Sequence, residues 1–125
     1  MNAYARSQIA YTQSKTATRS DQSIEYELFA KMTSSLARCS ENRAEDYPAF
    51  VSAIHGNRKL WLALAVDVAQ EGNKLPKKLR AQIFYLAEFT NTHSTKVLNE
   101  SAVVEPLIEI NRNVMKGLFS QRGVA

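Results

Sequence analysis

The sequence is poor in residues that cross-link a chain or interrupt a helix. Its single cysteine, Cys39, excludes an internal disulfide and favours a reducing compartment such as the cytoplasm. Four glycines and three prolines among 125 residues are too few for a fold made of many turns, so they favour long helices. No apolar run approaches the length of a membrane span, and we expect one domain with a modest core and no membrane insertion.

Residues that carry catalysis or hold a metal are also scarce. The two histidines, His55 and His93, fall on different expected helices, and no HExxH, paired ExxH or Cys/His cluster is present. The sequence has no glycine-rich phosphate loop, and Cys39 lies on an apolar helical stripe where a small core residue is expected. We therefore predict a protein that is not an enzyme and uses no metal or other cofactor.

Charge is unevenly distributed along the chain. Three of the 16 basic residues precede position 20 and none of the 12 acidic residues does, so the remainder is nearly neutral, with 13 basic and 12 acidic side chains. Such a body gives weak support to nucleic-acid binding, and we expect no DNA partner. One basic cluster remains, which is either a solvated turn or a contact with RNA or an acidic partner. Its members are Lys74, Lys77, Lys78 and Arg80.

Hydrophobic periodicity predicts four amphipathic helices, which begin near positions 20, 46, 76 and 105 and end near positions 42, 72, 98 and 121. Asp46 is a good N-cap for the second helix. Gly72 in "EGNKLP" is expected to supply the left-handed residue that follows this helix. Gly56 lies within the same helix, where it either admits close packing or marks a kink.

These helices predict an all-α protein, a compact bundle of about four amphipathic helices over residues 20–125. Residues 1–19 form a separate polar amino-terminal arm that is flexible alone or docks against a partner. The only tryptophan is expected to anchor the core. The expected core residues are Trp61, Asn57, Leu64 and Ile83.

Two Asn-Arg pairs interrupt apolar helical stripes, Asn57-Arg58 on the second helix and Asn111-Arg112 on the fourth. A buried amide must find hydrogen-bond partners or lower the stability of the fold. One interpretation is that the two asparagines bond to each other inside the bundle. The other is that Asn111 and Arg112 fix the register of a bound partner.

Two separated blocks of the sequence resemble one known family. "NRKLWLALAVDVAQEGNKLPKKLRAQI" (57–83) and "PLIEINRNVMKGL" (106–118) are similar to the FlaF family of alphaproteobacterial flagellar biosynthesis regulators. In the first block the resembling residues are Asn57, Leu60, Trp61, Leu64, Asp67, Ala69, Gly72, Asn73, Leu75, Pro76, Leu79, Arg80, Ala81 and Ile83. Weaker similarities are Tyr4, Glu25, Phe29 and Thr33. Phe89 is a mild departure, because the family often has tryptophan there.

The resemblance implies a small cytoplasmic helical protein that binds flagellin as a chaperone and promotes flagellin synthesis and secretion. It also implies action in balance with the regulator FlbT, and it suggests FlbT as a second partner. Two alternatives stay open. One is an RNA-associated post-transcriptional regulator of flagellin mRNA, and the other is an adaptor that binds FlbT and touches flagellin only indirectly.

A flagellin segment with an amphipathic helix would lie in an apolar groove of the bundle. The expected contact surface combines the fourth helix with three aromatic residues that lie off the main apolar stripe of the third helix. Its residues are Asn111, Arg112, Leu107, Ile108, Met115, Phe84, Tyr85 and Phe89.

Overall fold

The computed structural model describes residues 21–119, and all regular secondary structure within them is helical. The elements are α2 (Asp21–Glu41), α3 (Tyr47–Ala69), α4 (Lys77–Leu98), α5 (Glu105–Val114) and a π-helix, η1 (Met115–Phe119). This confirms the predicted all-α class and the predicted starts of the second, third and fourth helices. The amino-terminal arm predicted for residues 1–19 lies outside the described residues.

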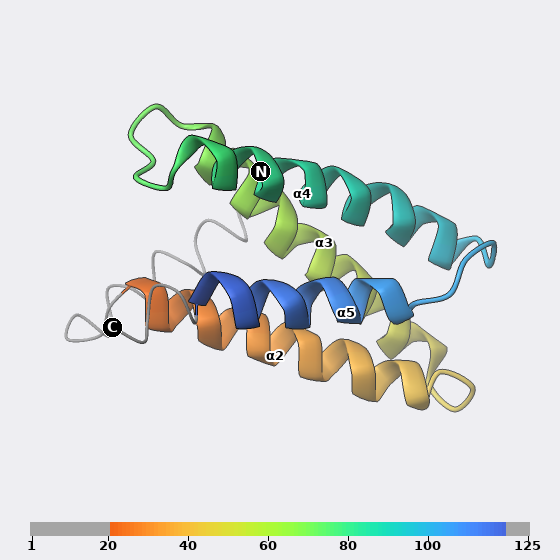
Figure 1. Cartoon of the computed structure of the whole chain (residues 1–125). Coiled ribbons are helices and arrows are strands. Elements are labelled where there is room, and N and C mark those ends of the chain that lie inside the picture. Colours follow the sequence, from red (N-terminus) through yellow and green to blue (C-terminus); the bar gives the residue numbers. More distant parts are fainter. Residues whose placement is uncertain (1–20, 120–125) are drawn as a thin grey trace.

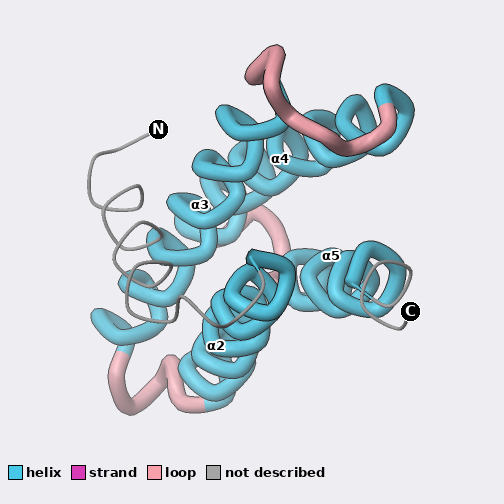
Figure 2. The backbone as a smooth tube through the Cα atoms, turned by 90° about the vertical axis from the view of Figure 1, so that its left-hand side faces the viewer, coloured by secondary structure: helices cyan, strands magenta, loops and turns pink. Residues whose placement is uncertain are grey.

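The helices form an up-and-down bundle in which each helix packs beside the one that precedes it, and α5 also returns to α2 (Figure 1). The view from the side shows α3 beside α4 and α2 beside α5 (Figure 2), and the chain reverses direction from each helix to the next (Figure 1). Short connections force these reversals, because a loop of a few residues cannot cross the length of a helix. α3 and α5 are therefore diagonal to each other.

The start of α3 follows from its sequence. The carboxylate of Asp46 accepts a hydrogen bond from the backbone N–H of Ala49 at 3.2 Å, and Pro48 lies in the first turn. Asp46 thus satisfies a donor that has no partner within the helix, as predicted.

The end of α3 differs from the prediction. No glycine among residues 21–119 has a positive φ, so Gly72 does not supply a left-handed cap, and Gln70 ends the helix in an extended conformation. Side chains bond the free carbonyls instead. The guanidinium Nε of Arg80 donates to the carbonyl of Val68 at 3.0 Å, and Nδ2 of Asn73 donates to that of Asp67 at 3.2 Å. With its last carbonyls bonded in this way, the helix needs no left-handed glycine.

Among residues 21–119, the left-handed conformation is found at Glu100, with a φ of 65°, just after α4. The backbone N–H of Ser101 donates to the carbonyl oxygen of Lys96 at 2.9 Å, and the N–H of Glu100 donates to the carbonyl oxygen of Val97 at 3.1 Å. This pair of bonds is a Schellman motif, usually built on glycine. A glutamate there gives no sequence signal, since non-glycine residues disfavour this conformation by about 1 kcal/mol or more.

The fourth helix is α-helical only as far as Val114 and continues as the π-helix η1. The sequence predicted one continuous α-helix to about residue 121, so this is a correction. Gly117, which has little preference for an α-helix, lies within the widened segment.

The core has two apolar clusters, one toward each end of the bundle. Trp61 anchors the first cluster and meets Phe29 edge-on, with ring centroids 5.6 Å apart. Ile83 is buried in the same cluster and Leu64 packs against it, half-buried. The second cluster is built around Phe50, Ile54, Val97 and Leu107. The expected core positions of Trp61 and Ile83 are therefore confirmed.

Gly56 faces α2 at a point where a methyl group would fit. A Cβ atom built there would lie 3.4 Å from Sδ and 3.8 Å from Cε of Met32, the mobile end of a flexible side chain. We expect Gly56→Ala to raise the free energy of unfolding by about 0.5–1 kcal/mol, because alanine favours the helix. Thermal unfolding followed by circular dichroism should show a melting temperature about 3 °C higher. A lower melting temperature would show that Met32 cannot move aside.

Candidate partner-binding site

A layer of buried polar side chains separates the two apolar clusters. Every helix of the bundle contributes to it, and in each helix the polar position falls between residues of the first and second clusters. Its members are Thr33, Asn57, Thr90, Ser94 and Asn111. We call these five residues the polar layer.

The two asparagines of the polar layer join diagonal helices. Nδ2 of Asn111 donates to Oδ1 of Asn57 at 2.7 Å, while Oδ1 of Asn111 accepts from the indole Nε1 of Trp61 at 2.8 Å. Both asparagine side chains are fully buried. The structure thus supports the internal interpretation of the asparagines. The bond to Trp61 was not predicted, because nothing in the sequence places the indole N–H beside Asn111.

Burial also corrects the expected contact surface. Asn111 and Leu107 are 0% exposed, so both belong to the interior and a partner cannot touch them in this conformation. Leu107 packs in the second apolar cluster, and Ile108 packs half-buried against that cluster. Arg112 is exposed, whereas Met115 is half-buried and approaches the hydroxyl of Thr33.

Other parts of the polar layer have no hydrogen bond among the described residues. Nδ2 of Asn57 and the hydroxyl groups of Thr90 and Ser94 are buried without a partner there. The hydroxyl of Thr33, in contrast, donates to the carbonyl of Phe29 at 2.6 Å. The asparagine pair therefore provides the hydrogen bonds that join α3 and α5 within the layer.

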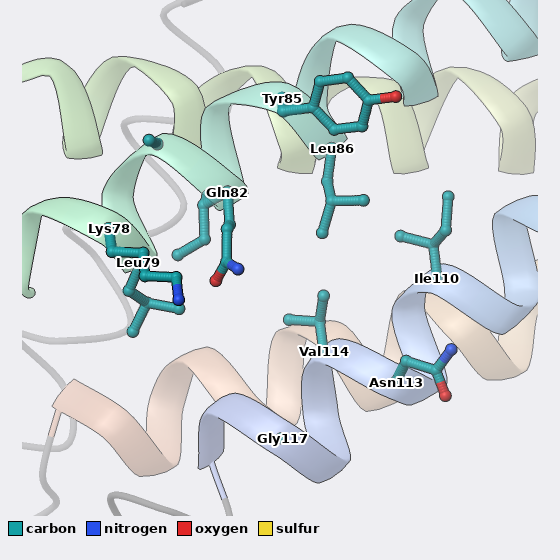
Figure 3. A pocket seen from close by; sticks show the side chains of 11 residues that line it. Lys78, Leu79, Gln82, Tyr85, Leu86, Ile110, Asn113, Val114 and Gly117 are labelled. Atoms are coloured by element: carbon teal, nitrogen blue, oxygen red, sulfur yellow. The ribbon is translucent and has the colours of Figure 1, made fainter.

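An apolar groove opens between α4 and α5, near the amino-terminal end of α4, and we call it the α4/α5 groove. Its volume is about 740 Å³. Leu86 from α4 and Ile110 and Val114 from α5 point into the space between the two helices (Figure 3). All three side chains are half-buried and pack against the first apolar cluster from its open side.

Four of the residues that line the α4/α5 groove carry polar side-chain groups. They are the amides of Gln82 and Asn113, the phenol of Tyr85 and the ammonium of Lys78, which is the one charged lining residue. Tyr85 is 68% exposed, the largest value among the large hydrophobic side chains whose burial the structure describes. An apolar floor with a few polar groups at its edges is the arrangement that binds an amphipathic helix.

A second groove lies between α3 and α4, and we call it the α3/α4 groove. It is smaller, about 360 Å³, and Leu62 and Val66 of α3 and Phe84 of α4 line it. Arg58, Glu88 and Asn91 lie along the same groove.

The three aromatic residues of the predicted surface therefore lie in three different places on the bundle. Tyr85 belongs to the α4/α5 groove and Phe84 to the α3/α4 groove. Phe89 lines neither groove and stacks on His93, with ring centroids 5.2 Å apart. The eight predicted contact residues do not form one surface, and only Tyr85 lines the larger groove.

Sequence reasoning missed most of the α4/α5 groove. Leu79 and Leu86 lie on the apolar stripe of α4, and Ile110 and Val114 on that of α5. The stripes were visible in the sequence. The sequence does not show that α4 and α5 leave a groove between them here, because the distance between two helices depends on how they pack in the bundle.

The basic cluster is divided by the structure. Arg80 caps α3 through its bond to Val68, so it is committed to the fold. Lys74, Lys77 and Lys78 are exposed. His93 also has an internal role, with Nε2 2.7 Å from the carbonyl oxygen of Val103.

Within residues 21–119, no group of three or more histidine, cysteine or acidic side chains is placed to hold a metal ion. None of the helices in this part of the chain combines the length and apolar character that crossing a membrane requires.

A four-helix bundle with an open apolar groove has the features of a module that binds a helical segment of another protein. The sequence matches the family model described as flagellar protein FlaF over residues 7–118, and the chain therefore belongs to the FlaF family. Comparisons with curated proteins and with solved structures gave no match. The protein is thus a flagellum-related protein.

Proposed function

We propose that this protein is a cytoplasmic chaperone that binds flagellin and promotes its synthesis and secretion, in balance with FlbT. Membership of the FlaF family supports the flagellar context. The observation that carries the binding role is the α4/α5 groove, which leaves the stripes of two helices partly uncovered.

The size of the groove suits a short stretch of helix. Its α4 wall runs from Lys78 to Leu86, a length of about 12 Å at the rise of an α-helix. This accommodates about two turns, enough for apolar anchors at positions i, i+3 or i+4, and i+7. Unassembled flagellin has amphipathic terminal segments that would otherwise self-associate, and covering one of them is the task of a chaperone.

The polar groups at the edges of the groove would set the register of the bound helix. Gln82 and Asn113 offer both amide donors and amide acceptors from opposite walls. A helix that slides by one residue would place apolar atoms against these amides, and the lost hydrogen bonds would reduce affinity.

Isothermal titration calorimetry of the full chain with monomeric flagellin at two salt concentrations tests this proposal. We expect a single-site interaction with a negative heat-capacity change, because apolar surface is buried. We expect affinity to change less than about threefold between 50 and 200 mM salt, since few charges line the groove. If flagellin fails to bind at both salt concentrations, the result would contradict the flagellin-binding role.

The exposed lysines favour one competing function, contact with the flagellin mRNA leader. Lys74, Lys77 and Lys78 could contact phosphates. Three such contacts would lower affinity for RNA roughly 20- to 40-fold over the same fourfold increase in salt. A steep salt dependence with RNA, together with no heat of binding to flagellin, would favour this alternative, whereas binding to FlbT alone would favour the adaptor role.

A further inference from the structure

α3 is apolar on two sides, and one of them faces away from the bundle. Between Leu60 and Ala69 the only charged residue is Asp67. Leu60, Trp61 and Val68 fill the first apolar cluster, whereas Leu62 is 48% exposed and lines the α3/α4 groove. A helix that is apolar on both sides is normally covered on both sides.

The α3/α4 groove continues this outward apolar face onto α4. Phe84 contributes an aromatic ring that is 43% exposed. The two helices are antiparallel, and the Nη2 atom of Arg58 donates to Oδ1 of Asn91 at 2.9 Å, which sets their relative heights. Counting seven residues from this bond along each helix places Phe84 level with Ala65, so Val66 is about 1.5 Å further along α3.

Charges of both signs lie at one end of the face. Arg58 belongs to α3 and Glu88 to α4, and both line the groove. Glu88 is less than one helical turn from the level of Arg58 along the helix pair. The α4/α5 groove lacks this feature, because its only charged lining residue is Lys78.

We propose that the α3/α4 groove binds a second copy of this chain in a two-fold symmetric dimer. A two-fold axis parallel to α3 and α4, between two such faces, lays α3 of one copy over α4 of the other at the same height. Arg58 of each copy then faces Glu88 of the second copy, and Phe84 of each copy packs over Leu62 and Val66 of the second.

This charge pattern selects a second copy over other occupants. A two-fold interface must be self-complementary, with each contact made twice. One cation and one anion on different helices at similar heights satisfy that requirement, while like charges would repel. The dimer leaves the α4/α5 groove open, so it does not depend on flagellin binding.

Exchange of the two charges tests the dimer by sedimentation velocity of the full chain over a range of concentrations. We expect the parent protein to dimerise reversibly. Arg58→Glu places glutamates opposite Glu88, and Glu88→Arg places arginines opposite Arg58, so each variant alone should dimerise at least tenfold more weakly. An equimolar mixture of the two variants should form a heterodimer, because both contacts then join opposite charges.

The mixture shows whether the two substitutions act at the interface or on the fold. A folding defect in either variant would persist after mixing, whereas an interface defect would be repaired. Leu62→Gln, at an exposed position, should weaken the dimer without exchange of charge. A parent protein that remains monomeric at all concentrations up to 1 mM overturns the proposal, as does a mixture that stays monomeric while the parent dimerises. Crosslinking from position 62 to residues 1–20 of the same chain would assign the groove to the amino-terminal segment and also overturn the dimer.

Discussion

Replacing Asn111 with leucine is expected to lower the free energy of unfolding by about 3 kcal/mol or more, although the two side chains are similar in size. The substitution removes the acceptor of the Trp61 indole N–H and the donor to Asn57. Each buried group left without its partner costs about 1–3 kcal/mol. Chemical denaturation followed by the fluorescence of Trp61, the sole tryptophan, measures the change directly.

A matched control lies in the same polar layer. The hydroxyl of Ser94 is buried without a hydrogen-bond partner among the described residues. We therefore expect Ser94→Ala to change the free energy of unfolding by less than about 1 kcal/mol, since no bond is lost and alanine favours the helix. Equal effects of the Asn111 and Ser94 substitutions would contradict the role assigned to the asparagine pair. A folded Asn111→Ala variant that has lost flagellin binding would return Asn111 to the contact surface.

Replacing Tyr85 with alanine is expected to lower the affinity for flagellin at least tenfold while leaving stability unchanged. Tyr85 is largely exposed and lines the α4/α5 groove, so its ring has little to contribute until a partner covers it. Tyrosine is one of the residue types whose truncation in an interface most often costs about 2 kcal/mol or more. Calorimetric titration of the variant with monomeric flagellin and a thermal unfolding curve provide the two measurements.

The neighbouring residue supplies the control. Phe84 precedes Tyr85 in the sequence but lines the α3/α4 groove. We expect Phe84→Ala to leave flagellin affinity within about threefold of the parent, because its ring lies on a different face. Loss of flagellin binding in the Phe84 variant but not in the Tyr85 variant would place flagellin in the α3/α4 groove instead.

The sequence by itself determined the helices and much of the core. Helix starts depend on local chemistry, and a carboxylate at Asp46 caps the next turn wherever the helix later packs. The spacing of apolar residues likewise settles which side of a helix is buried, because helix geometry repeats every 3.6 residues. Trp61 and Ile83 could therefore be assigned to the core before the structure was known.

Only the tertiary structure decided how the ends and the polar positions are used. Gly72 was expected to cap α3, yet Arg80 from the next helix donates to the carbonyl of Val68 near the end of α3. The sequence left two interpretations of Asn111, and its partners lie 50 and 54 positions away in the chain. The sequence could not choose between the two interpretations, because the packing of α3 and α5 in the bundle determines whether these side chains meet.

The candidate site depends almost wholly on tertiary structure. Leu86 and Val114 occupy the same kind of stripe position as fully buried core residues, yet they line an open groove. Phe84 and Tyr85 are adjacent in sequence but face different grooves, because neighbouring residues on a helix point about 100° apart. Periodicity identified apolar side chains, and the spacing of the helices decided which of them another protein can reach.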